Sequence, residues 1–146
     1  PPNRFHQIIQ QALTWSIETY IRKNNGSCEV YPAHFPFFLI SDKTYVEPDI
    51  SIICDKSKLD DRGCSGAPDW VIEIASLSTK RTDYGVKLFK YRSAGVREYW
   101  IVNPLTKTVN VYDLKKEELS DQYSFDDDIQ VCIYDNLMIN IAELLK

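Results

Sequence analysis

The stretch Asp69–Pro104, DWVIEIASLSTKRTDYGVKLFKYRSAGVREYWIVNP, decides the fold. Residues 69–75 form a nearly continuous apolar run of the length of a buried strand. Residues 79–94 predict a helix that ends at Gly95, and the apolar and aromatic residues 98–102 predict a second strand. A strand, a helix and a second strand in this order are typical of a sheet protein of the α/β class.

The sequence on either side of this unit adds further strands and two helices. Apolar residues at three- and four-residue intervals predict an amphipathic helix over residues 4–23, and residues 55–68 read as a polar loop. The other predicted elements are strands over 28–39, 45–54, 108–114 and 130–134 and a short closing helix over 139–144. Together they predict a mixed α/β sheet flanked by helices, with residues 1–146 as a single domain because no repeat or linker divides them.

Length and composition agree with a globular domain. The chain has 146 residues, of which 44% are hydrophobic and 26% charged. Its apolar stretches are broken well before the roughly 20 residues of a membrane span, and no signal peptide opens it, so we expect no membrane association and a cytoplasmic location. The chain starts at Pro1 and its single methionine is Met138, which indicates that the native N-terminus is missing.

The four cysteines show neither the spacing of a zinc site nor that of a disulfide-rich scaffold. No C-x-x-C pair occurs, and no histidine stands at metal-ligand spacing from them. In a reducing compartment we expect them to be buried free thiols. They are Cys28, Cys54, Cys64 and Cys132.

Charge is unevenly distributed along the chain. The net charge of −4 argues against a protein that coats nucleic acid through bulk electrostatics. Positive residues nevertheless gather in one segment, which permits a local strip of phosphate contacts. The residues proposed for this strip are Lys80, Arg81, Lys90 and Arg92.

Three residues in neighbouring elements suggest metal-dependent chemistry. Asp49 follows Pro48 at the start of a predicted strand, and Glu73 interrupts an apolar strand at a core-facing position. Two such carboxylates can hold Mg²⁺, which lowers the pKa of a bound water and neutralises charge on phosphate oxygens. Lys87, in the helix that follows, could orient or deprotonate the attacking water.

Structural roles explain each of these residues separately. Asp49 could be a turn residue, and Lys87 a solvated helix charge. Glu73 could form a buried ion pair with Lys87 or Arg81, since an unpaired carboxylate in a strand interior costs several kcal/mol.

The neighbours of these residues suggest supporting roles. Helical spacing places Asp83, Lys87, Lys90 and Tyr91 on one face, so that Asp83 could hold the Lys87 ammonium. Ser76 either supports the site or caps the helix. His6 has no partner visible in the sequence, and we expect it to be a solvated or capping residue of the first helix.

The run from Asp69 to Pro104, together with Pro48-Asp49-Ile50 and Arg4-Phe5-His6-Gln7, closely resembles the Uma-two family of restriction endonucleases, in the PD-(D/E)XK nuclease superfamily. The resemblance spans nearly the whole chain. It implies a mixed sheet flanked by helices, with a metal-dependent phosphodiesterase site at the sheet edge.

The same resemblance implies roles for individual residues. Asp49 and Glu73 would be the metal ligands, and Lys87 the catalytic lysine, with Ser76, Asp83 and Tyr91 in support. The superfamily motif places its lysine two residues after the acidic residue, where this chain has Ala75.

The leading hypothesis is therefore a Mg²⁺-dependent endonuclease that hydrolyses DNA, with Mn²⁺ as a substitute metal. A double-strand cutter of this size would act as a homodimer, since one site cuts one strand. A catalytically silent binding module with the nuclease fold, and a hydrolase of RNA or nucleotides, are the alternatives.

Overall fold

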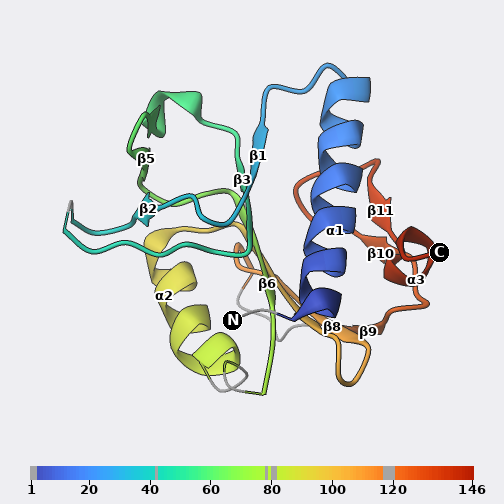
Figure 1. Cartoon of the computed structure of the whole chain (residues 1–146). Coiled ribbons are helices and arrows are strands. Elements are labelled where there is room, and N and C mark those ends of the chain that lie inside the picture. The colour runs from blue at the N-terminus through green and yellow to red at the C-terminus, as the bar shows by residue number, and fades with distance from the viewer. Residues whose placement is uncertain (1–2, 42, 78, 80–81, 117–120) are drawn as a thin grey trace.

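The protein folds around a six-stranded mixed sheet (Figure 1). The structure, a computed structural model, describes residues 3–41, 43–77, 79, 82–116 and 121–146. Its helices are α1 (Arg4–Lys23), α2 (Lys87–Ala94), α3 (Ile141–Leu144), the 3₁₀ turn η1 (Lys56–Lys58) and the π-helical turn η2 (Thr82–Val86). Its strands are β1 (Glu29–Pro32), β2 (Phe37–Phe38), β3 (Ile50–Ile53), β4 (Leu59–Asp60), β5 (Gly63–Ser65), β6 (Trp70–Ile74), β7 (Glu98–Asn103), β8 (Thr108–Asp113), β9 (Asp121–Ser124), β10 (Ile129–Gln130) and β11 (Met138–Ile139).

The main sheet has the strand order β1-β3-β6-β7-β8-β9. Only β6 and β7 pair in parallel, and all other neighbours are antiparallel. The parallel pair is joined through α2, because a parallel connection needs a crossover long enough to return the chain to the same end of the sheet. The predicted mixed α/β fold is confirmed.

The two faces of β6 pack against different helices. Trp70, Ile72 and Ile74 belong to the larger apolar core, which the buried stripe of α1 completes. Val71 and Ala75 belong to a second core that includes Tyr91 of α2. Figure 1 shows α1 and α2 on opposite sides of β6. Because side chains alternate along a strand, Glu73 shares the α2 face with Val71 and Ala75.

Short elements account for most differences from the predicted secondary structure. The predicted polar loop 55–68 contains β4 and β5, which form a small sheet with β2. The predicted strand 130–134 is reduced to β10, paired with the unpredicted β11, and β9 was also missed. Strands of two to four residues are too short to show a hydrophobic period in the sequence. Within the described residues, no helix is long and apolar enough to cross a membrane.

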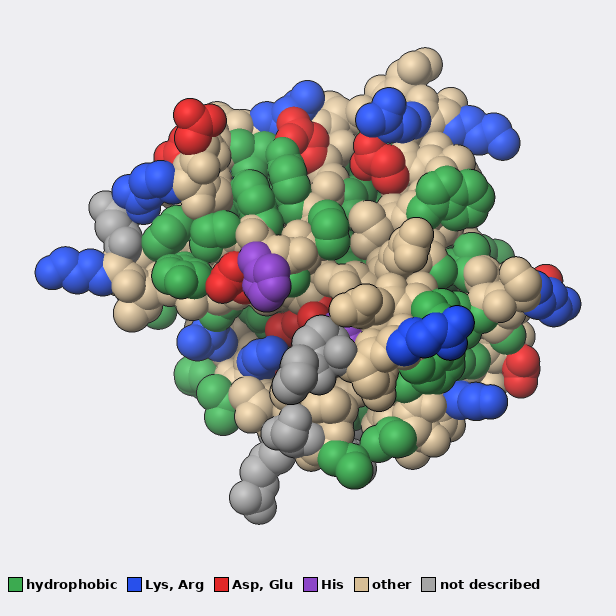
Figure 2. Space-filling view, viewed as in Figure 1, with side chains coloured by type: hydrophobic (Ala, Val, Ile, Leu, Met, Phe, Trp, Pro, Cys, Tyr) green, Lys and Arg blue, Asp and Glu red, His purple; other side chains and the backbone are tan. Residues whose placement is uncertain are grey.

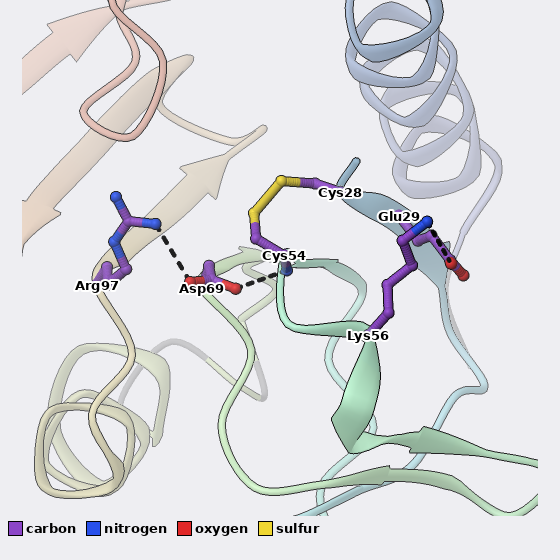
Figure 3. Close-up of a disulfide and its surroundings, with 6 residues drawn as sticks. All are labelled: Cys28, Glu29, Cys54, Lys56, Asp69 and Arg97. Atoms are coloured by element: carbon purple, nitrogen blue, oxygen red, sulfur yellow. Dashed lines mark hydrogen bonds and ion pairs between the residues drawn. A yellow bond between two sulfur atoms is a disulfide. The ribbon is translucent and has the colours of Figure 1, made fainter. Parts of the chain in front are cut away.

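The prediction of four free thiols is wrong for two cysteines. Cys28, just before β1, forms a disulfide with Cys54, just after β3 (Figure 3). β1 and β3 are antiparallel neighbours with Glu29 opposite Ile53, which brings the flanking cysteines together. Cys64 is free and buried, as expected, whereas Cys132 is free but only partly buried. Because disulfides are rare in reducing compartments, this one does not support the expected cytoplasmic location.

Candidate metal and catalytic site

Strand register brings the two predicted ligands together. β3 and β6 are antiparallel with Ile50 opposite Ile72, so the residue before Ile50 comes opposite the residue after Ile72. The Asp49 N–H accordingly donates to Glu73 Oε1 at 3.0 Å. In return, the Ile74 N–H donates to Asp49 Oδ2 at 2.8 Å. Asp49 is therefore fixed against β6 through both its backbone and its carboxylate.

Glu73 is also held from the α2 side. Its Oε2 accepts a hydrogen bond from the Tyr91 hydroxyl at 2.9 Å, and the same oxygen lies 2.9 Å from Lys87 Nζ. Lys87 Nζ is also 3.1 Å from Asp83 Oδ1. Successive spacings of four residues place Asp83, Lys87 and Tyr91 in line along η2 and α2. The residues expected around Glu73 thus do meet there.

The four charged side chains of this site differ in how far they are exposed to solvent. The side chains of Glu73 and Asp83 are 4% and 1% exposed, whereas those of Asp49 and Lys87 are 23% and 31% exposed. Figure 2 shows acidic, basic and histidine side chains close together near the middle of one face of the molecule. An external molecule can therefore reach Asp49 and Lys87, while Glu73 lies beneath them.

Burial dominates the protonation of Glu73 but not that of Lys87. It raises the pKa of the Glu73 carboxyl well above its ordinary value, and Lys87 opposes only part of that shift. Burial acts to lower the pKa of Lys87, but the charge of Glu73 and then that of Asp83 outweigh it, so the Lys87 pKa is raised. The ammonium of Lys87 is thus stabilised by two carboxylates, and Glu73 depends on a nearby cation for its charge.

The residues proposed for phosphate contacts are only partly within the described part of the chain. Lys90 and Arg92 are exposed on α2, so Lys90 does not share the buried environment of Asp83 and Tyr91. Successive residues turn by about 100° along a helix, which directs Lys90 away from Tyr91. Lys80 and Arg81 lie outside the described residues.

Ser76 contributes to the turn that follows β6. Its N–H donates to Thr79 Oγ1 at 2.9 Å, and the two hydroxyl oxygens are 3.1 Å apart. The Thr79 N–H in turn donates to Ser76 Oγ at 3.3 Å. These contacts lie in a turn that precedes η2, which begins at Thr82, and the N-cap residue of α2 is Val86, so Ser76 shapes this turn and does not cap the helix.

The sequence analysis missed His6. It was expected to be solvated or capping, but its side chain is 14% exposed and its Nε2 lies 3.3 Å from Asp49 Oδ1. The contact with Asp49 raises the pKa of His6 against the opposing effect of burial. One signal was available: His6 precedes Ile9 and Leu13 at helical spacing, so it heads the buried stripe of α1.

A second buried carboxylate shows what distinguishes Glu73. Glu98 accepts hydrogen bonds from the Trp100 indole N–H at 2.6 Å and from the backbone N–H groups of Cys132 and Ile133 at 3.0 Å. Burial raises the pKa of Glu98, and these donors oppose the shift. All of these donors are neutral, and Glu98 is fully buried, so its role is structural. Glu73, by contrast, contacts a half-buried lysine at a surface.

The donor atoms decide whether the two carboxylates suit a divalent cation. Counting partners among the described residues, Asp49 Oδ1 has only the long contact to His6, and Glu73 Oε1 accepts a single backbone N–H, so each oxygen retains acceptor capacity. Among the described residues, no cluster of three or more His, Cys, Asp and Glu side chains could hold a metal. Mg²⁺ needs only one or two carboxylates, because water and phosphate oxygens complete its shell. The donor set therefore fits hydrated Mg²⁺.

Comparisons with known proteins bear on the family and the fold of the chain. Residues 1–134 match the sequence model of the Uma2 family, described as "Putative restriction endonuclease". No curated protein is significantly similar to the chain. Among solved structures, the fold is similar to that of "a putative nuclease belonging to DUF820" from Anabaena variabilis ATCC 29413. The two chains share 22% sequence identity and superpose with a TM-score of 0.77 over 99% of this chain and 82% of the other.

Proposed function

The chain belongs to the Uma2 family of restriction-endonuclease-like nucleases, and we propose on this basis that it is a Mg²⁺-dependent endonuclease that hydrolyses phosphodiester bonds in DNA. The observation that carries the proposal is that the main sheet and α2 meet at one carboxylate, that of Glu73. The β3–β6 register sets Asp49 against Glu73, and α2 brings Lys87 to the same carboxylate at 2.9 Å.

Asp49 and Glu73 would hold the metal. Bound Mg²⁺ would make an attacking water more acidic and offset the charge that develops on the phosphate oxygens. The chain itself supplies the orientation of its ligands. The Ile74 N–H fixes Asp49 Oδ2, and the Tyr91 hydroxyl fixes Glu73 Oε2, so both carboxylates keep one oxygen directed by the protein.

Lys87 would act on the water and the scissile phosphate. Its ammonium lies at the exposed side of Glu73, and Asp83 contacts it from beneath. A compact ammonium on a flexible stem can donate to a phosphate oxygen or orient a water. Asp83 and Glu73 limit where that ammonium can go, which supports a positioned group rather than a mobile surface charge.

Cleavage of plasmid DNA tests the proposal. The purified chain should convert supercoiled plasmid to nicked and linear forms with Mg²⁺ or Mn²⁺ and should not do so in EDTA. A Glu73→Gln preparation, purified in the same way, controls for contaminating nucleases. Single-stranded RNA and nucleoside triphosphates are assayed beside the plasmid. Cleavage of RNA or nucleotides alone would replace DNA as the substrate, and metal-independent cleavage would contradict the mechanism.

A silent binding module with this fold is the second candidate, and one observation favours it. Both Glu73 oxygens already have partners within the protein, and Lys87 forms the ion pair that a purely structural role requires. Such a module would bind DNA without cutting it. The plasmid assay separates the two functions if binding is measured on the same preparation.

We propose that exposed positive residues of α2 contact DNA phosphates, together with Lys80 and Arg81. Replacing Lys90 and Arg92 by Met should reduce the slope of log Kd against log salt by about one to two, since each neutralised phosphate contributes roughly 0.9. Fluorescence anisotropy with labelled duplex and the Glu73→Gln background measures the slope without cleavage. A Lys23→Met, Lys146→Met variant removes the same charge at other surfaces and should keep the slope. Equal slopes for all three proteins would place the DNA on another face.

A further inference from the structure

We propose that His6 is a positioning residue for this site: it fixes the carboxylate of Asp49 in the orientation in which Asp49 binds the cation. The inference rests on the proposed function and adds α1 as a third element to a site otherwise built from the sheet and α2. It concerns a residue 43 positions from its partner in a chain where the other histidine, His34, is 86% exposed.

Asp49 is held by contacts from β6 and from α1. The Ile74 N–H holds Oδ2 at 2.8 Å. The Gln10 side-chain amide donates to the Asp49 backbone carbonyl at 2.8 Å, and His6 Nε2 lies 3.3 Å from Oδ1. Without His6, the side chain would keep one anchored oxygen and could still rotate the other. His6 is therefore the contact that determines where Oδ1 points.

α1 provides a rigid support for this contact. His6 and Gln10 are four residues apart, so both project from one face of the helix toward the same residue. The backbone N–H of His6 donates to the side-chain oxygen of the N-cap residue Asn3 at 2.8 Å, which fixes the first turn of α1. Ile9 and Leu13, next along the stripe, are fully buried. The imidazole is consequently anchored by the core and not by a mobile loop.

Asp49 is the partner of the imidazole among the described residues. The imidazole Nδ1 is buried and, among the described residues, has no hydrogen-bond partner. The only ion pair or side-chain hydrogen bond of His6 in that part of the chain is the one with Asp49. The imidazole is thus directed at the Asp49 carboxylate, which is the arrangement that a positioning residue requires.

Outer-shell partners of this kind control metal affinity. Removing a residue that orients a ligand typically costs tenfold to a hundredfold in metal affinity or activity. His6→Phe keeps the ring and its packing but removes the nitrogen. His6→Gln keeps a nitrogen at a similar reach from the backbone. The pair therefore separates orientation of Asp49 from simple filling of space.

The test measures Mn²⁺ binding by calorimetry, thermal unfolding in EDTA, and plasmid cleavage for each variant. His6→Phe should bind Mn²⁺ about tenfold to a hundredfold more weakly. His6→Gln should recover most of that affinity, and both should unfold close to the wild-type temperature. His34→Phe is the matched control, because it replaces the exposed histidine that pairs with Glu47, and it should behave as wild type.

Two results would overturn the inference while leaving the proposed function intact: wild-type Mn²⁺ affinity in His6→Phe, or equal losses in His6→Phe and His6→Gln. If His6→Phe does not fold, His6→Gln and His6→Leu take its place, and the comparison between them decides in the same way. A wild-type protein that neither binds Mn²⁺ nor cleaves DNA would instead refute the proposed function.

Discussion

Asp49→Asn and Glu73→Gln are each expected to abolish binding of a divalent cation and cleavage of DNA while the protein stays folded. Both substitutions keep the shape of the side chain and remove its negative charge. Asparagine and glutamine still carry an oxygen that can accept the N–H of Ile74 or Asp49. Each variant keeps a single carboxylate, and without DNA no substrate phosphate completes the shell of the cation, so its binding to the free protein should fall below detection.

The folded state should tolerate Glu73→Gln in particular. Replacing a buried carboxylate by a neutral group removes its desolvation cost, and Lys87 keeps Asp83 as a partner at 3.1 Å. Glutamine has a single amide oxygen, and when this oxygen accepts the Asp49 N–H, the Tyr91 hydroxyl can rotate to accept from the NH₂ group. We therefore expect the free energy of unfolding in EDTA to change by no more than about 1 kcal/mol, in either direction.

Calorimetry with Mn²⁺ and urea unfolding in EDTA measure these two effects separately. Glu47→Gln is the matched control, because it removes a carboxylate two residues from Asp49 that pairs only with the exposed His34 among the described residues. That variant should bind Mn²⁺ as the wild type does. Unchanged Mn²⁺ affinity in both Asp49→Asn and Glu73→Gln would show that the cation, if any, binds elsewhere.

The sequence was sufficient to place Glu73 and the residues of α2 around it. Strand alternation puts Glu73 on the face of Val71 and Ala75, and a four-residue helical spacing puts Asp83, Lys87 and Tyr91 in line. Both patterns are local, so they survive without knowledge of the fold. Asp83 lies in the π-helical turn η2 and not in α2, yet Asp83, Lys87 and Tyr91 still meet around Glu73.

The contacts of Asp49 with α1 could not be predicted in the same way. His6 and Gln10 reach Asp49 across the start of β3, and no periodicity in the sequence encodes which helix face meets which strand end. The disulfide depended on a similar unknown. Cys28 and Cys54 flank paired strands, but their proximity follows only from the β1–β3 register, which the broken apolar pattern before Leu39 did not reveal.

Lys87→Met is expected to reduce the rate of DNA cleavage at least roughly a hundredfold, the low end for a positioned acid or base, while Mn²⁺ binding is retained. The superfamily position for this lysine is occupied by Ala75, which is buried and carries no charge. Ala75 lies on the same face as Glu73, and its small side chain leaves space there. Lys87 reaches the Glu73 carboxylate from α2 at 2.9 Å and can occupy that role.

Lys90 is the competing lysine, and the structure gives it a different environment. It is exposed, and no ion pair between Lys90 and another described residue is formed, whereas Lys87 contacts both Glu73 and Asp83. A residue that contacts only DNA phosphates affects binding of the substrate, so Lys90→Met should raise KM and leave kcat close to that of the wild type. Lys87→Met should lower kcat, since we propose that the Lys87 ammonium acts at the reacting phosphate.

Single-turnover cleavage at saturating DNA, combined with Mn²⁺ calorimetry, distinguishes these effects. Methionine keeps the length of the lysine stem, so a loss of rate reports the missing ammonium and not a gap in packing. Lys87→Met removes a partner of two buried carboxylates, and urea unfolding must show that the variant is folded at the assay temperature. A normal rate for Lys87→Met with an inactive Lys90→Met would move the catalytic role to Lys90. Normal rates for both would mean that cleavage at Asp49 and Glu73 proceeds without a lysine from α2.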